Sequence, residues 1–189
     1  MIVYLHGFNS SPQSHKARVL EQYMAERGLA AEYRCPSLPP LASEAVRAIE
    51  RCLPPSGPLC FVGSSLGGFY ATHLAERLDA RAVLINPAIE PHVGLRAYLG
   101  PQKNLHSGEP YELTEAHLRE WEALIVPRVT SQRYLLLVET GDEVLDYRAA
   151  VRRYAGAEQV VIEGGDHSLQ SFPRHLPRIL AFAGHADPV

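Results

Sequence analysis

A serine in a glycine-rich segment is the first candidate for chemistry in this 189-residue chain. Gly63, Ser65 and Gly67 match the pattern G-x-S-x-G, in which a tight turn between a strand and a helix exposes a serine hydroxyl. An apolar run of strand type precedes the pattern, and a stretch of helical type follows it. Glycines at the two flanking positions allow the close backbone packing that such a turn requires. We therefore expect Ser65 to be a nucleophile, the alternative being a turn that binds a phosphate group at the helix amino terminus.

A serine hydroxyl reacts near neutral pH only when a base removes its proton and an acid orients that base. In the chain order of α/β-hydrolases, the acid and then the histidine follow the serine, each in a loop after a strand. His167 lies in the segment EGGDHS, directly after the strand-like run Gln159–Ile162. We predict that His167 is the general base. The alternative is a surface histidine that caps the last helix.

Several carboxylates precede the histidine and could orient it. Asp142 comes directly after the strand-like run Tyr134–Glu139, where its carboxylate could accept the imidazole N–H. Asp146 begins the next expected helix and has the residue type of an N-cap. Asp166 adjoins the histidine and is poorly placed to reach its neighbour's ring. We assign the acid to Asp142 and keep Glu143 and Asp146 as alternatives.

The predicted acyl-transfer chemistry also needs backbone donors for the oxyanion and residues that hold the substrate. We expect the N–H groups of Phe8, which follows a turn at His6, and of Leu66, which follows the nucleophile, to form the oxyanion hole. His6 itself is interpreted as structural. Asn9 and Trp121 are the predicted substrate-binding residues, and the alternative for Asn9 is a turn that caps the first helix.

The elements that must position these residues alternate along the chain between short apolar runs and stretches of helical periodicity. The expected strands are Ile2–Leu5, Ala31–Cys35, Leu59–Val62, Ala82–Ile85, Tyr134–Glu139 and Gln159–Ile162, and the expected helices are His15–Arg27, Ser43–Cys52, Gly68–Leu78, Asp146–Tyr154 and Leu169–Ala183. This alternation predicts an α/β fold with a compact, mostly parallel sheet of about six strands and helices on both faces.

One segment, residues 87–133, interrupts the alternation and is too long for an ordinary connection. Its second half predicts an amphipathic helix within Leu113–Ile125. The apolar face of that helix carries Leu118, Trp121, Leu124 and Ile125. We expect a short cap-like insert within a single domain that spans residues 1–189. The alternative is a crossover helix with a loop.

Composition excludes several classes of protein. Hydrophobic residues make up 46% of the chain and charged residues 21%, which is enough apolar side chain for a sizeable core. The net charge of −3 lacks the basic excess of nucleic-acid-binding proteins. The three cysteines have no metal-binding spacing, and no apolar run approaches the roughly 18 residues of a membrane helix. The amino-terminal residues lack the cationic region of a secretory signal. We expect a cytoplasmic protein with no metal, no nucleic-acid partner and no integral membrane segment, and we leave its oligomeric state open.

Five segments, in the same order and over nearly the whole chain, resemble the YqiA-type esterases, small bacterial members of the α/β-hydrolase superfamily. The segments are HGFNSSP at 6–12, GSSLGGFYA at 63–71, INPA at 85–88, TGDEVLDYR at 140–148 and EGGDHS at 163–168. The resemblance implies an α/β-hydrolase fold and a cytoplasmic esterase active on acyl-CoA thioesters and simple activated esters. It also implies a triad of Ser65, Asp142 and His167.

The sequence thus predicts a serine esterase that hydrolyses carboxylic esters, acyl-CoA thioesters or both through an acyl-enzyme intermediate, without a cofactor. Its expected partner is a small-molecule acyl ester or acyl-CoA. Two alternatives remain. One is an acyltransferase or lyase that uses the same triad, and the other is a non-catalytic, hydrolase-like binding module.

Overall fold

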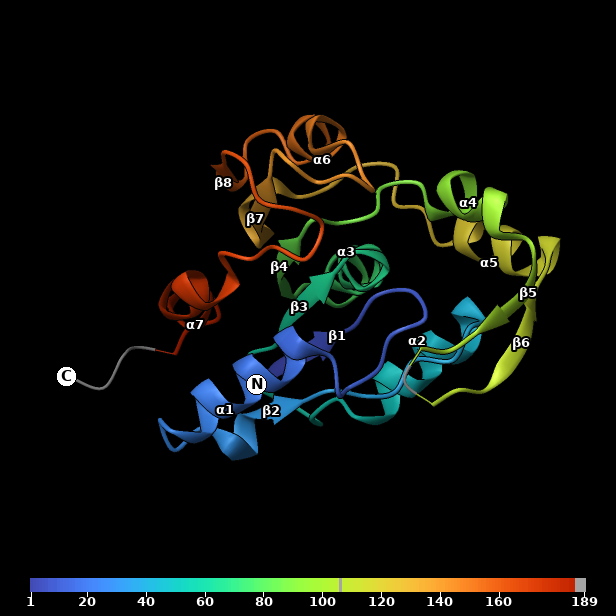
Figure 1. Cartoon of the computed structure of the whole chain (residues 1–189). Coiled ribbons are helices and arrows are strands. Elements are labelled where there is room, and N and C mark those ends of the chain that lie inside the picture. The colour runs from blue at the N-terminus through green and yellow to red at the C-terminus, as the bar shows by residue number, and fades with distance from the viewer. Residues whose placement is uncertain (106, 186–189) are drawn as a thin grey trace.

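The structure, a computed structural model, describes residues 1–105 and 107–185. Its main sheet contains six strands, in which every neighbouring pair is parallel (Figure 1). In spatial order they are β2 (Tyr33–Arg34), β1 (Ile2–Leu5), β3 (Cys60–Ser64), β4 (Arg81–Ile85), β7 (Tyr134–Glu139) and β8 (Glu158–Ile162). The predicted parallel α/β sheet is confirmed. Because the strands are parallel, the loops after β3, β7 and β8 leave the sheet at the same edge.

Helices cover both faces of the sheet, as predicted (Figure 1). One face packs against α1 (His15–Ala25) and α7 (Leu176–Phe182), and the other packs against α2 (Ala42–Arg51), α3 (Leu66–Leu78) and α6 (Tyr147–Arg153). Helix α5 (Glu115–Ala123) adds side chains to the core on this second face and contacts α2. Strand β1 shows why both faces are apolar. Ile2 and Tyr4 belong to the first core, whereas Val3 and Leu5 belong to the second, because successive side chains of a strand point to opposite faces.

The insert between β4 and β7 contains an antiparallel strand pair that the sequence did not predict. After α4 (Pro91–Gly94) and the 3₁₀ turn η2 (Leu95–Tyr98), the chain forms β5 (Gly100–Lys103) and β6 (Pro110–Leu113). Prolines and glycines made this segment look like a loop. Prolines are tolerated here because both strands of a two-stranded ribbon are edge strands. The predicted amphipathic helix is present as α5, followed by the 3₁₀ turn η3 (Ser131–Arg133).

The predicted strand Ala31–Cys35 is largely wrong. Residues Ala30–Glu32 form the 3₁₀ turn η1, and only Tyr33 and Arg34 pair with β1. This strand lies at the edge of the sheet and has a neighbour on one side only. Its apolar residues therefore gain little by extending the pairing.

The predicted final helix, Leu169–Ala183, is broken into two pieces, the 3₁₀ turn η4 (Phe172–His175) and α7. Pro173 and Pro177 explain the break, since each lacks a backbone N–H and is tolerated only in the first turn of a helix. Helix α3, by contrast, is longer than predicted. It begins at Leu66, two residues earlier than predicted, and so starts directly after Ser65.

The expected single domain over residues 1–189 includes positions 106 and 186–189, which lie outside the described residues. In the part of the chain that the structure describes, every helix is too short or too polar to cross a membrane.

Candidate active site

Ser65 occupies a strained turn between β3 and α3. Its backbone angles, φ 55° and ψ −120°, lie in a region that side-chain-bearing residues rarely adopt. Two hydrogen bonds hold this conformation: the Ser65 N–H donates to the carbonyl of Ile85 at 3.0 Å, and its carbonyl accepts from the N–H of Ala88 at 3.0 Å. The end of β4 therefore fixes the turn that presents the Ser65 side chain.

The glycines around the turn are required by close backbone contacts. A Cβ atom on Gly63 would collide with the backbone of Gly67, and a Cβ atom on Gly67 would collide with the backbone of Leu5 in β1. These collisions give the G-x-S-x-G spacing its physical reason: β3, α3 and β1 approach one another more closely than side chains allow.

Ser65, His167 and Asp142 lie within one chain of hydrogen bonds. Nε2 of His167 lies 3.1 Å from Oγ of Ser65, and Nδ1 of His167 lies 2.8 Å from Oδ2 of Asp142. A carboxylate can only accept, so the ring donates from Nδ1 and its Nε2 is free to accept the serine proton. The three residues come from the loops after β3, β7 and β8, at one edge of the sheet.

The environment of Asp142 favours its charged form. Its side chain is only 1% exposed, and burial raises the pKa of a carboxyl group. Hydrogen bonds from His167 and from the N–H groups of Leu145 and Val144 outweigh that effect, so the pKa of Asp142 lies below its ordinary value. Asp142 thus presents a carboxylate to the imidazole.

The other carboxylates that the sequence offered have different positions. Asp146 caps α6 by accepting from the N–H of Arg148 at 3.0 Å. Glu143 accepts the backbone N–H of His167 at 3.0 Å, and Asp166 accepts the N–H of Ser168 at 2.8 Å. Of these carboxylates, only Asp142 is hydrogen-bonded to the imidazole ring.

A buried carboxylate, Glu139, organises the histidine loop and was missed by the sequence analysis. Glu139 is 1% exposed and accepts hydrogen bonds from the N–H groups of Asp166 (2.9 Å), Gln170 (3.1 Å) and Ser171 (3.0 Å) and from the Ser171 hydroxyl (2.6 Å). Burial raises the pKa of Glu139, but these hydrogen bonds outweigh it and hold the pKa below its ordinary value. A charged residue at the end of the apolar run Tyr134–Glu139 was the only sequence signal.

Two further residues hold the same loop. The Asn86 side chain, after β4, donates to the carbonyls of Asp166 and His167, both at 3.1 Å. Nζ of Lys16, in α1, donates to the carbonyl of Ser168 at 2.7 Å. Neither contact could be deduced from local sequence, because each joins segments at least 80 residues apart.

The predicted oxyanion donors, Phe8 and Leu66, both line a small cavity of about 30 Å³ beside the elbow. That volume is about the share of one water molecule in liquid water. Within the described residues, neither backbone N–H has a hydrogen-bond acceptor. His6 is buried and structural in its contacts, since its Nε2 accepts the N–H of Leu38 at 3.1 Å and its Nδ1 lies 3.1 Å from the carbonyl of Gly7.

Asn9 connects the loop after β1 to the strand pair β5–β6. Its Oδ1 accepts the hydroxyl of Tyr111 at 2.7 Å, and its Nδ2 donates to Oε1 of Gln102 at 3.2 Å. Its carbonyl accepts the N–H of Leu105 at 3.0 Å. These bonds engage both polar atoms of the side chain with the insert, so the contacts of Asn9 position the loop that carries Phe8.

Trp121 is fully buried in α5. Its indole N–H donates to the hydroxyl of Tyr70 at 2.7 Å, and its ring meets the edge of Phe8 with centroids 6.4 Å apart. Trp121 therefore packs behind Phe8 and borders the small cavity beside it. Within residues 1–105 and 107–185, no group of three or more His, Cys, Asp or Glu side chains is arranged to hold a metal ion.

Comparison with known proteins identifies the family. Residues 1–184 match the model of the uncharacterised protein family UPF0227. The chain belongs to UPF0227. A UPF0227 protein of Pectobacterium atrosepticum is 27% identical, over 96% of this chain and 98% of that protein. The UPF0227 protein YcfP of Salmonella gallinarum is 26% identical with the same coverage.

Solved structures show the fold of this UPF0227 member. A putative hydrolase from Agrobacterium vitis superposes with a TM-score of 0.75 at 22% identity, over 96% of this chain and 87% of that chain. Mouse alpha/beta hydrolase domain-containing protein 10 gives 0.71 at 19% identity, over 97% and 88%. Est1E from Butyrivibrio proteoclasticus, solved with ferulic acid bound, gives 0.66 at 14%, over 96% and 86%. The fold is that of the α/β-hydrolases. The predicted α/β-hydrolase fold is confirmed, whereas the resemblance to the YqiA-type esterases stays a prediction; the family found is UPF0227, with YcfP proteins among its members.

Proposed function

We propose that this UPF0227 protein is a serine hydrolase that cleaves carboxylic esters or acyl thioesters through an acyl-enzyme intermediate. The observation that carries the proposal is the continuous hydrogen-bonded series Ser65–His167–Asp142, with distances of 3.1 and 2.8 Å, built on a strained turn. The α/β-hydrolase fold supports it, because that fold carries this arrangement at the same sheet edge.

In the first half-reaction, Nε2 of His167 accepts the proton of the Ser65 hydroxyl while Oγ attacks the substrate carbonyl carbon. The carbonyl π electrons move to oxygen, and the N–H groups of Phe8 and Leu66 stabilise the resulting oxyanion. Collapse of the tetrahedral intermediate breaks the bond to the alcohol or thiol, which takes the proton from His167. Asp142 stabilises the imidazolium that exists between these steps.

In the second half-reaction, water replaces the alcohol or thiol. His167 accepts a proton from water, the hydroxide adds to the acyl carbon, and the intermediate releases the acid while Ser65 recovers its proton. These steps use no metal or organic cofactor.

The test compares wild type, Ser65→Ala and Ser64→Ala. We expect wild type and Ser64→Ala to hydrolyse p-nitrophenyl esters or palmitoyl-CoA and to be labelled by a serine-reactive phosphonate, and Ser65→Ala to do neither. Ser64 is a matched control because it is adjacent in the chain yet buried at the end of β3. Hydrolysis by Ser65→Ala at the wild-type rate would contradict the proposal.

Two alternatives give different results in the same assays. An acyltransferase would release free acid only slowly until an acyl acceptor is added. A non-catalytic binding module would remain unlabelled by the phosphonate while folding normally.

A further inference from the structure

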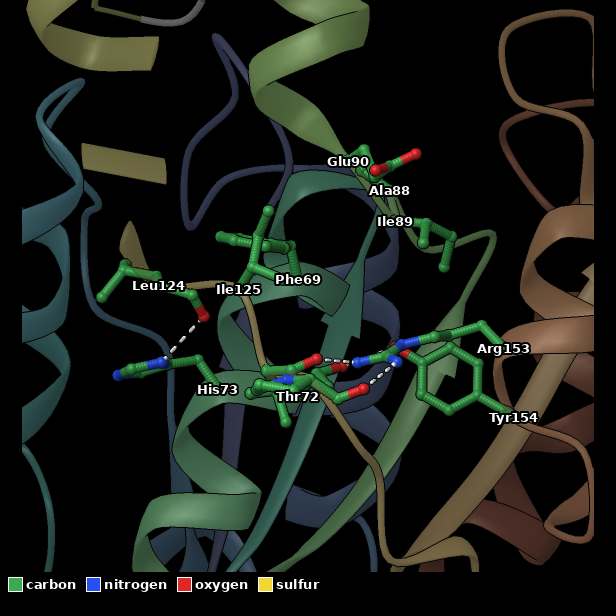
Figure 2. A pocket seen from close by; sticks show the side chains of 12 residues that line it. Phe69, Thr72, His73, Ala88, Ile89, Glu90, Leu124, Ile125, Arg153 and Tyr154 are labelled. Carbon is green, nitrogen blue, oxygen red and sulfur yellow. Dashed lines mark hydrogen bonds between the residues drawn. The ribbon is translucent and has the colours of Figure 1, made fainter. Parts of the chain in front are cut away.

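A mainly apolar cavity of about 250 Å³ lies beside α3, on the side where the insert leaves and rejoins the sheet (Figure 2). One wall is α3 itself, through Phe69, Thr72 and His73, which lie four, seven and eight residues after Ser65 and so share one helix face. The opposite walls are the ends of the insert, at residues 88–90 and 124–127, and the end of α6.

The near end of this cavity lies next to the nucleophile's backbone. Ala88 lines the cavity, and its N–H donates to the carbonyl of Ser65 at 3.0 Å. Phe69 follows Ser65 by a single helical turn. Figure 2 shows Phe69 and Ile89 beside Ala88. A group extending from an acyl carbon on Ser65 would need to pass the small side chain of Ala88 to enter the cavity between them.

The far end is closed by hydrogen bonds within the protein. The Thr72 and Tyr154 hydroxyls lie 2.7 Å apart. The Arg153 guanidinium donates to the carbonyl of Pro127 at 3.0 Å and to that of Val126, as the dashed lines in Figure 2 show. Each of these polar groups thus has a hydrogen-bond partner within the protein.

His73, in the side wall, also has a hydrogen-bond partner within the protein, because its Nδ1 lies 3.0 Å from the carbonyl of Leu124. The remaining surface is mainly apolar and comes from Ala88 and the side chains of Phe69, Ile89, Leu124 and Ile125; the exposed Glu90 adds one carboxylate to it. Because most of the lining is apolar, an apolar ligand gains the burial of apolar surface there, whereas a polar ligand loses hydration against these walls.

We propose that this cavity binds the acyl chain of the substrate and sets its length, a proposal that rests on the proposed hydrolase function. A buried cavity of about 150 Å³ holds a benzene molecule, and a water molecule takes about 30 Å³. A methylene group is similar in size to water, so this cavity accommodates a chain of about eight carbons. The substrate class is therefore medium-chain acyl esters or thioesters.

The wild-type enzyme supplies the first measurement, which is kcat/KM for p-nitrophenyl esters from acetate to palmitate. We expect a maximum near octanoate. A maximum at acetate or at palmitate would overturn the assignment of the cavity.

Two variants that fill the cavity supply the second measurement. We expect Ile89→Trp and Leu124→Trp each to lower the ratio of kcat/KM for octanoate to that for acetate by about tenfold or more, because each methylene group excluded from an apolar pocket weakens transition-state binding. Leu78→Trp is the matched control, since Leu78 is a partly exposed apolar residue at the other end of α3, outside the cavity. Circular dichroism checks that each variant folds.

The outcomes separate this inference from the function on which it rests. In one outcome, wild type hydrolyses esters and is labelled by the phosphonate while both pocket variants leave the octanoate-to-acetate ratio of kcat/KM unchanged. That result would overturn the acyl cavity alone. Absence of both hydrolysis and labelling in wild type would overturn the hydrolase and the acyl cavity together.

Discussion

The side-chain amide of Asn86 holds the backbone of His167. Its Nδ2 donates to the His167 carbonyl at 3.1 Å, and its Oδ1 accepts the N–H of Glu139 at 3.1 Å. Asn86 follows β4, Glu139 ends β7 and His167 follows β8, so one buried amide joins three neighbouring strand ends. The imidazole is therefore positioned through its backbone as well as through Asp142.

Asn86→Asp tests this role. The carboxylate can still accept from Glu139 but cannot donate to the two loop carbonyls, which lose their partner. We expect the free energy of unfolding to fall by about 1–3 kcal/mol, which urea denaturation measures. We also expect kcat to fall with little change in KM, since the base is displaced while the acyl cavity is untouched. Unchanged kcat in a destabilised variant would reduce Asn86 to a purely structural residue.

Glu139→Gln tests the buried carboxylate through pH. The pKa of Glu139 is depressed in the folded state, so its stabilising contribution is present above the unfolded-state pKa and is lost as pH falls through the folded-state pKa. Glu139→Gln should thus be less stable than wild type at neutral pH, with a difference that shrinks below about pH 4. Urea denaturation between about pH 3 and pH 7 measures this difference.

The control for that experiment is Glu158→Gln. Glu158 is about half exposed at the start of β8, and its only described ion pair, with Arg178, spans 3.6 Å. We expect this change to alter stability by less than about 0.5 kcal/mol at every pH. A difference between wild type and Glu139→Gln that stays constant with pH would show that the Glu139 charge does not stabilise the loop.

Asp142→Asn and Asp146→Asn form a matched pair that tests the acid. An amide at 142 presents a donor as well as an acceptor to the ring and no longer selects the tautomer with a proton on Nδ1, so we expect kcat to fall by roughly four orders of magnitude. Asparagine is as good an N-cap as aspartate, so Asp146→Asn should keep both stability and activity. Steady-state ester hydrolysis compares the two. The reverse ranking would transfer the orienting role to Asp146.

Tyr111→Phe tests whether the insert positions the oxyanion loop. The change removes the hydroxyl that donates to Asn9 at 2.7 Å and leaves the ring in place. We expect kcat to fall by about three- to tenfold, because a misplaced oxyanion donor costs part of the two to three orders of magnitude that one such donor supplies. Tyr98→Phe is the control. The Tyr98 ring also packs against this loop, through Phe8, but its hydroxyl bonds to nothing in the described residues. Equal kcat values for the two variants would show that the insert does not position the oxyanion loop through this hydroxyl.

Some parts of the site could be predicted because they lie in local sequence motifs, and others could not because they depend on contacts between distant segments. Ser65 and His167 were predicted because each lies in a short motif after an apolar strand, and β3 and β8 have the strand-type composition that places those motifs. Glu139 and Asn86 were missed because their partners are set by which strands become neighbours. Local sequence carries no information on the order β4-β7-β8, on which both contacts depend.

In the insert, local sequence predicted the helix but not the strand pair. Helix α5 was predicted because its apolar residues recur with helical periodicity. Strand β5 contains Pro101 and lacks alternating apolar residues, and β6 begins with Pro110 and offers only the short alternation of Tyr111 and Leu113. Their pairing is supported by contacts with the loop after β1, including the bond from Tyr111 to Asn9. Tertiary contacts thus stabilise a strand pair for which the local sequence has little preference.

Gly67→Ala and Gly94→Ala test the close packing that makes the elbow possible. Both glycines lie in helices, so a propensity argument predicts that alanine stabilises each by about 0.4–1 kcal/mol. At Gly94 the added methyl group meets open space, and we expect that gain. At Gly67 it meets the backbone carbonyl of Leu5, which cannot move without shifting β1 within the sheet. We expect a loss of at least about 3 kcal/mol or failure to fold, measured by thermal and urea unfolding. Similar stabilities for the two variants would mean that α3 can withdraw from β1, and the strained presentation of Ser65 would then need another cause.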